Sequence, residues 1–151
     1  MSMDRFISLW THPGYPPEAV SEEELKQTEA RLHTHLPSDY RSAVCQYGLP
    51  NPVGALLDAI VDRELDQKDV SEFLTPSDII DVTLEWRDLG LSEELVAFAT
   101  DCIGNLFCFP TAPDIRDCLP VIWFNHDDAT IDIVAPSFSE WIDAFCRILQ
   151  H

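Results

Sequence analysis

Apolar residues before Gly90 recur at intervals of three and four positions, which is typical of helices with one buried face. These stretches begin after helix-start signals and end at glycine or at proline-rich turns. Ser21 and Glu24, for example, form a capping box that satisfies the free amides of a helix start. The pattern predicts a short helix around Phe6, Leu9 and Trp10 and further helices from Ser21 to about His35, from Pro37 to Gly48 and from Thr75 to Gly90.

The region between the predicted helices is less regular. Two prolines make residues 49–54 a loop, because each fixes φ and removes an amide donor. Residues 55–61 are apolar and fit either a buried strand or a short helix, and of the two we expect a strand. Residues 62–72 are mostly charged, which indicates a solvated loop or a polar helix face.

The second half of the chain contains short apolar runs separated by polar turns, which predicts antiparallel hairpins. Ser137 and Glu140 then repeat the capping box before a terminal amphipathic helix. The predicted fold is a single α+β domain over 1–151, with N-terminal helices, a central, mostly antiparallel sheet of at least four strands, and the C-terminal helix packed on the sheet. The predicted strands are 95–100, 106–109, 121–124 and 130–134, and the apolar face of the terminal helix comprises Phe138, Trp141, Ile142, Phe145 and Leu149.

Length and composition place the chain among ordinary soluble domains. It has 151 residues, of which 46% are hydrophobic and 24% charged, values typical of a globular core and surface. No run approaches the roughly 20 apolar residues that cross a bilayer. The first residues also lack the basic and apolar segments of a secretory signal, so we expect a cytoplasmic protein with no membrane partner.

The net charge bears on the partner. Nine Lys and Arg against 27 Asp and Glu give 9 − 27 = −18. Such an excess repels nucleic acid phosphates and favours a protein partner with a basic surface. Acidic composition that serves only solubility is the alternative interpretation.

The chemistry-bearing residues do not predict a catalytic or metal site. The five cysteines form no CxxC pair and leave one over in any disulfide scheme, so we expect reduced thiols and no zinc or other cofactor. A hydrolase could be assembled from Cys102, His126 and Asp127, but no nucleophile motif surrounds Cys102. His126, Asp127, Asp128 and Asp132 lack the glycine-containing loop of a calcium site, and turn formation explains them more simply.

For partner binding, loop carboxylates and exposed aromatic residues are the best candidates, since charges steer association and aromatic anchors hold it. Trp86, Trp123 and Trp141 lie on stripes that predict core positions. The candidate contacts are therefore Asp62, Glu64, Asp66, Asp114, Asp117, Asp127 and Asp128, with Trp10 and Tyr15 near the first proline-rich turn as anchors.

Three segments together resemble the SUKH superfamily, in particular its Smi/Knr-type domains. Residues 29–47 contain Leu36-Pro37-Ser38-Asp39-Tyr40, similar to the start of the family's second helix. Residues 95–109 contain a Gly104-Asn105 hairpin turn, and residues 120–145 contain a His126-Asp127 turn before Ser137-Phe138. The chain departs from the family in having Gly48-Leu49-Pro50 after its second helix and Ile103 before Gly104.

The resemblance implies a bacterial immunity protein that binds and neutralises a toxin, commonly a nuclease, without catalysis. A nuclease holds phosphates in a basic cleft, so an acidic inhibitor is physically suited to it. A regulatory scaffold of the same family is the first alternative, and the Cys102 hydrolase is the second.

Overall fold

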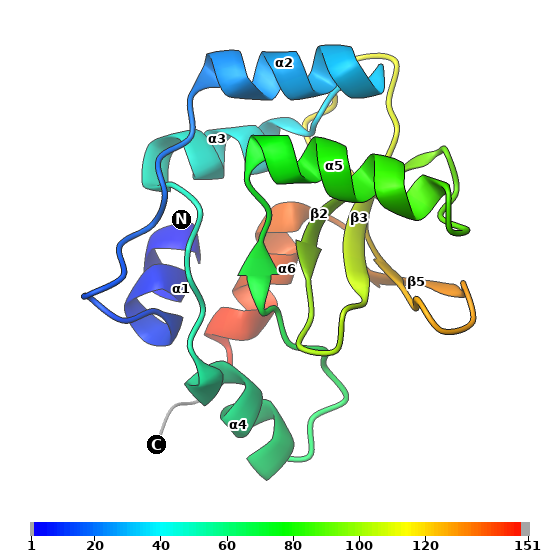
Figure 1. Cartoon of the computed structure of the whole chain (residues 1–151). Coiled ribbons are helices and arrows are strands. Elements are labelled where there is room, and N and C mark those ends of the chain that lie inside the picture. Colours follow the sequence, from blue (N-terminus) through cyan, green and yellow to red (C-terminus); the bar gives the residue numbers. More distant parts are fainter. Residues whose placement is uncertain (1, 149–151) are drawn as a thin grey trace.

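A computed structural model describes residues 2–148 of the chain as an α+β fold (Figure 1). The elements are α1 (Ser2–Trp10), α2 (Glu22–Leu32), α3 (Ser38–Tyr47), α4 (Gly54–Asp62), β1 (Glu72–Phe73), α5 (Pro76–Arg87), β2 (Leu95–Thr100), β3 (Leu106–Pro110), β4 (Val121–Phe124), β5 (Ile131–Ala135) and α6 (Phe138–Cys146).

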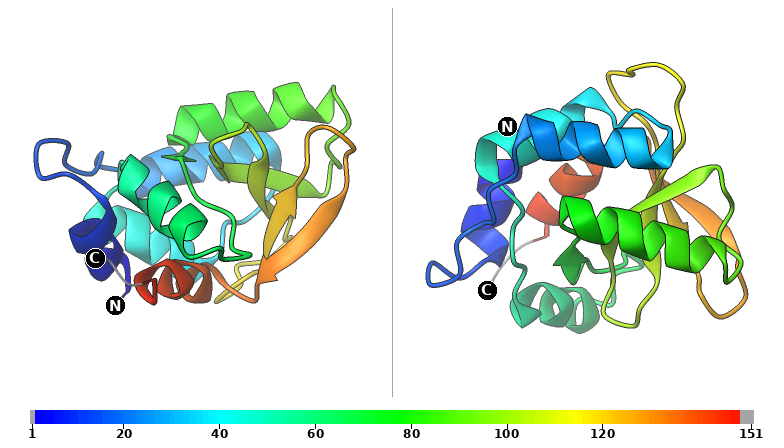
Figure 2. Two further views of the ribbon diagram at one scale, coloured as in Figure 1. Left: turned by 90° about the horizontal axis from the view of Figure 1, so that it is seen from below. Right: turned by 45° about the horizontal axis from the view of Figure 1, so that its top comes forward.

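The five strands form one antiparallel meander in the order β1-β2-β3-β4-β5, which confirms the hairpins expected from the sequence. Helices α2 and α5 lie on one face of this sheet and α6 on the other (Figure 2). Trp86 of α5 packs edge-on against Phe124 of β4, whereas Trp141 of α6 packs against Phe107 of β3. Because helices cover both faces, β2 and β3 are buried along almost their whole length.

An aromatic cluster fills the space between the sheet and α6. Phe98 and Phe109 stack with ring centroids 4.0 Å apart. Tyr40 of α3 and Phe138 of α6 meet edge-on at 5.2 Å, and Trp141 closes the cluster against Phe98. Such pairs each contribute about 1 kcal/mol beyond the burial of their area, so this cluster anchors α3 and α6 to the sheet.

Local start signals place the helices where the sequence predicted them. Ser21 and Glu24 form the expected capping box, and Thr75 and Ser137 cap α5 and α6. The predicted helix that extends to His35 ends earlier, at Leu32, because His33 adopts a left-handed conformation with φ 55°.

Residues 55–61 correct one prediction, since they form helix α4 and not a strand. Leu56, Ala59 and Ile60 are its buried residues, at the i, i+3 and i+4 spacing of a helix face. The place beside β2 is taken by β1, which begins at Glu72 within the segment predicted to be a charged loop.

Other differences are smaller. Strand β5 begins at Ile131, one residue later than predicted, and α5 ends at Arg87, which leaves Leu89 exposed. Trp141 is a core residue as expected, whereas Trp86 and Trp123 are only partly buried. Leu149, predicted on the terminal helix, lies outside the described residues. None of the described helices combines the length and apolar character needed to span a membrane.

Candidate partner-binding surface

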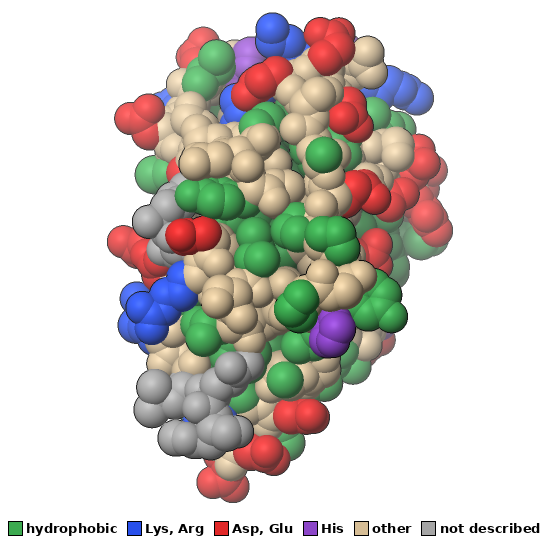
Figure 3. Space-filling view, turned by 90° about the vertical axis from the view of Figure 1, so that its left-hand side faces the viewer, with side chains coloured by type: hydrophobic (Ala, Val, Ile, Leu, Met, Phe, Trp, Pro, Cys, Tyr) green, Lys and Arg blue, Asp and Glu red, His purple; other side chains and the backbone are tan. Residues whose placement is uncertain are grey.

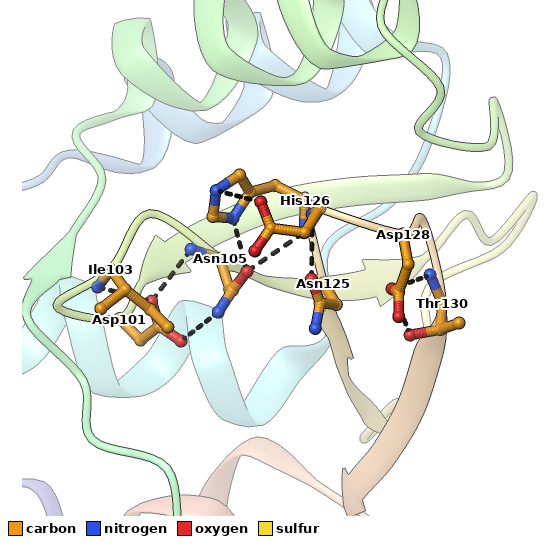
Figure 4. A network of polar contacts seen from close by, with 8 residues as sticks. Asp101, Ile103, Asn105, Asn125, His126, Asp128 and Thr130 are labelled. Carbon is orange, nitrogen blue, oxygen red and sulfur yellow. Dashed lines mark hydrogen bonds and ion pairs between the residues drawn. The ribbon is translucent and has the colours of Figure 1, made fainter.

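A buried carboxylate ties together the two hairpin turns at one end of the sheet (Figure 4). Asp101, 6% exposed, accepts hydrogen bonds from the backbone amides of Ile103 at 3.0 Å and Asn105 at 2.9 Å. It also accepts from the Asn105 side-chain amide at 3.0 Å and from the indole of Trp123 at 3.1 Å. Four donors therefore fix the Asp101 carboxylate and bind the turn after β2 to strand β4.

The second turn is attached to the first through Asn105. The Asn105 side-chain oxygen accepts the backbone amide of His126 at 3.0 Å and lies 2.6 Å from His126 Nδ1 (Figure 4). Within this turn Asp128 accepts from the backbone amide and the hydroxyl of Thr130, and these bonds lower the pKa of Asp128. The Gly104-Asn105 and His126-Asp127 motifs thus form one rigid structural unit.

The possible hydrolase residues do not form a catalytic arrangement. The Cys102 amide bonds to Asp69 at 3.5 Å, and burial together with Asp69 raises the pKa of the Cys102 thiol. A raised pKa is the opposite of what activates a nucleophilic thiolate. The His126 ring instead contacts Asn105, Trp86 and, at 3.3 Å, Asp127. Among residues 2–148 no three His, Cys, Asp or Glu side chains are grouped as metal ligands.

The candidate carboxylates fall at two opposite ends of the sheet. The antiparallel order places the turn with Asp127 and Asp128 at the same end as the turn after β2. The segment with Asp62, Glu64 and Asp66 follows α4 and leads to Asp69 at that same end. All five candidates there are exposed.

Asp114 and Asp117 lie at the other end, in the exposed loop between β3 and β4. Backbone bonds hold this loop against the start of α3, because the amides of Ser38 and Asp39 donate to Arg116 and Asp117 carbonyls at 2.9 and 3.0 Å. One flat contact with all seven carboxylates is therefore not possible within this fold, and the candidates form two separate groups.

Of the two predicted aromatic anchors, one is exposed and the other is not. Trp10 is 0% exposed and donates its indole N–H to the Phe145 carbonyl at 3.0 Å, so its role as an exposed anchor was wrong. Trp10 and Phe6 have the spacing of one helix face, and this face lies in the core. The prediction of an exposed Trp10 relied instead on the proline-rich turn beside it. Tyr15 is 68% exposed.

The proline-rich loop that presents Tyr15 is held in place. Glu18 and Leu49 exchange backbone hydrogen bonds at 2.9 and 2.8 Å, and the Asn51 side chain donates to the Pro16 carbonyl at 3.2 Å. Figure 3 looks onto the side of the molecule that carries this loop, where hydrophobic side chains form a band with acidic side chains around its margins. Tyr15 therefore projects from a rigid support.

A cavity of about 370 Å³ lies between the acidic segment after α4, strand β5 and α6. Asp66, Lys68 and Asp132 supply its charged groups, and Phe107, Val134 and Trp141 supply apolar surface. The Lys68 ammonium lies 4.3 Å from the centroid of the Trp123 ring. Sequence reasoning missed this cavity, because residues far apart in the chain form it and each alone has an ordinary pattern.

The structure is that of a small α+β protein in which the Gly104-Asn105 and His126-Asp127 turns serve structure. The model of the SMI1 / KNR4 family (SUKH-1) matches residues 19–144, most of the chain. The chain therefore belongs to this family, as its three motif segments indicated. A comparison with curated proteins gave no match.

Proposed function

We propose that this protein is a cytoplasmic immunity protein that binds and neutralises a bacterial toxin with a basic surface, without catalysing a reaction. Membership of the SMI1 / KNR4 family is consistent with an immunity-like protein. The observation that carries the proposal is the net charge of −18.

The ion pairs show how few of the carboxylates have a cationic partner within the fold. In the described part of the chain, Lys and Arg pair with only two carboxylates, Glu22 and Glu29, and both bind Arg41. Most of the remaining carboxylates, unlike the buried Asp69 and Asp101, are exposed and project a negative field toward solvent. Such a field accelerates association with a basic protein and disfavours acidic ones.

Rigidity supports the same role. The Asp101 network fixes the turn that carries Asp127 and Asp128, and the backbone bonds to α3 fix the loop that carries Asp114 and Asp117. Carboxylates on fixed loops lose little conformational freedom on binding, so more of the interaction energy remains for affinity. A protein that blocks a toxin by complementarity benefits from this preorganisation.

The proposal predicts that a neighbouring gene encodes a toxin domain, and the test is co-expression of this chain with that domain. Cells that carry both should survive, and cells that carry the toxin domain alone should die. Replacing Asp62, Glu64 and Asp66 by Asn, Gln and Asn should weaken protection. A second variant, with Asn in place of Asp114 and Asp117, tests the carboxylates at the opposite end of the sheet for comparison. Equal killing with and without the wild-type chain would refute the proposal, and retrieval of several unrelated partners would favour a scaffold.

A further inference from the structure

Strand β5 is an edge of the sheet, because β4 is its only neighbour in the strand order. Figures 1 and 2 show β5 at the outer margin of the sheet. The strand follows a tight turn in which the Asn125 amide donates to the Thr130 carbonyl at 2.9 Å. This bond determines which amides and carbonyls of β5 face β4 and which face the free edge.

In an antiparallel ladder, residues alternate between those whose backbone groups face the partner strand and those whose groups face away. Asn125 donates to Thr130, so the next residue of β5 that faces β4 is Asp132, paired with Trp123. The amides and carbonyls of Ile131 and Ile133 therefore point to the free edge. They offer the donors and acceptors that a further strand would use.

This edge also carries little of the protection that natural edge strands usually have. Its side chains include no lysine and no proline, and Asp132 is its only charged residue. Ile131 is 58% exposed and Ile133 is 69% exposed. Two neighbouring isoleucines on one face of an open edge form an apolar strip that a partner strand could cover.

The opposite face of the same strand borders the cavity described above. Asp132 and Val134 line it together with Asp66, so its rim holds two carboxylates against the single Lys68 ammonium. Phe107 and Trp141 provide an apolar floor. A long basic side chain fits such a site, since its stem packs on apolar surface while its charged end reaches carboxylates.

We propose that β5 is a docking edge for an extended segment of the toxin, which adds a sixth strand with apolar and basic side chains in alternation. The apolar side chains cover Ile131 and Ile133, and a basic side chain enters the cavity beside Asp66 and Asp132. Main-chain bonds supply affinity and the alternate side chains supply specificity. This inference rests on the proposed function for the identity of the partner.

A second copy of the chain is a poorer occupant. Two chains of charge −18 repel each other, and pairing β5 with β5 would bring two Asp132 side chains together without a cation. A basic partner avoids both the repulsion between two acidic chains and the contact of two Asp132 side chains. Charge complementarity therefore selects a strand from a different protein.

The test needs no toxin, since the probe is a blocked synthetic peptide in which valine and arginine alternate. Hydrogen exchange of the full chain, followed residue by residue with saturating peptide, should slow at the Ile131 and Ile133 amides by about tenfold. A peptide with glutamate in place of arginine, or with N-methylated valines, should give no protection. Absence of protection by the arginine peptide overturns the docking edge, whatever the co-expression result.

Matched variants separate docking from folding. Ile133→Lys should weaken peptide binding at least tenfold. Ile115→Lys should leave it unchanged, since Ile115 is similarly exposed, at 65%, but lies in the loop between β3 and β4. Lys68→Met should tighten binding, because it removes the one cation of the cavity. Equal effects of the two lysine variants, or a wild-type dimer that Ile133→Lys dissolves, would overturn the proposal.

Discussion

The carboxylate of Glu29 lies buried against the guanidinium of Arg41, which joins α2 to α3. The second oxygen of Glu29 accepts the backbone amide of Leu36 at 2.8 Å, so the same side chain also closes the connection between these helices. Arg41 binds Glu22 as well, at 2.7 Å. Glu29 belongs to the first segment that resembles the family, and its contacts give that motif a structural role.

Glu29→Ala should lower the free energy of unfolding by about 3 kcal/mol, because it removes the buried partner of Arg41 and leaves the Leu36 amide without its acceptor. Urea unfolding followed by circular dichroism would measure the loss. Glu22→Ala is the matched control, since the Glu22 side chain is 54% exposed and exposed pairs contribute about 1 kcal/mol or less. Similar losses in both variants would contradict the structural role of Glu29.

The Asp101 network should matter more for stability than any other polar group at its end of the sheet. Asp101→Ala removes an acceptor from four donors, and we expect a loss of about 3 kcal/mol. Trp123→Phe removes only one of these bonds and should cost about 1 kcal/mol for that bond. Thermal unfolding of both variants tests this order, and a larger effect of Trp123→Phe would contradict it.

Much of this fold follows from local sequence. Ser21, Thr75 and Ser137 start their helices through their own side chains, and the hairpins follow from apolar runs around polar turns. Residues 55–61 were mistaken because a short apolar run fits a strand or a helix, and only the packing of Leu56 and Ile60 decides. The burial of Trp10 depends on α6, at the far end of the sequence.

The binding surface was less predictable for a similar reason. The exposure of Tyr15 and of the loop carboxylates could be anticipated from neighbouring prolines and charges. The division of these carboxylates between the two ends of the sheet could not be anticipated from the sequence, because it depends on the strand order. The alternation of isoleucine and aspartate in β5 is visible in the sequence. The exposure of these side chains is not, because it follows from the position of β5 at the edge of the sheet.

Tyr15 and Trp10 should respond in opposite ways to mutation. Tyr15→Ala removes an exposed side chain, so stability should change by less than about 0.5 kcal/mol while protection against the toxin decreases. Trp10→Ala empties a core site and should cost about 3–5 kcal/mol of stability. Unfolding curves and toxin survival assays of both variants would measure this. Undiminished protection by Tyr15→Ala would remove Tyr15 from the interface.

Stability should also depend on pH through Asp69. Burial raises the pKa of Asp69, so the folded state holds the proton more tightly than the unfolded state does. The stability contribution of this group is then greatest at low pH and is lost as pH rises from about 4 through the folded pKa. Asp69→Asn cannot ionise, so its stability relative to wild type should improve between pH 4 and pH 7. Parallel urea curves at both pH values give the difference, and a constant difference would contradict the raised pKa.

Salt should distinguish electrostatic steering from apolar contact in the toxin complex. Exposed carboxylates act over about 8 Å at physiological ionic strength and over about 3 Å in 1 M salt, so the association rate should fall steeply as salt is added. Dissociation should change much less if it depends on the proposed contacts at β5, which are buried in the complex. Neutralising Asp62, Glu64 and Asp66 together should lower the association rate by about tenfold and reduce its salt dependence. Stopped-flow mixing of the wild-type and neutralised chains with the toxin domain measures both rates. An association rate indifferent to salt in the wild-type chain would mean that the charge of −18 serves something other than partner capture.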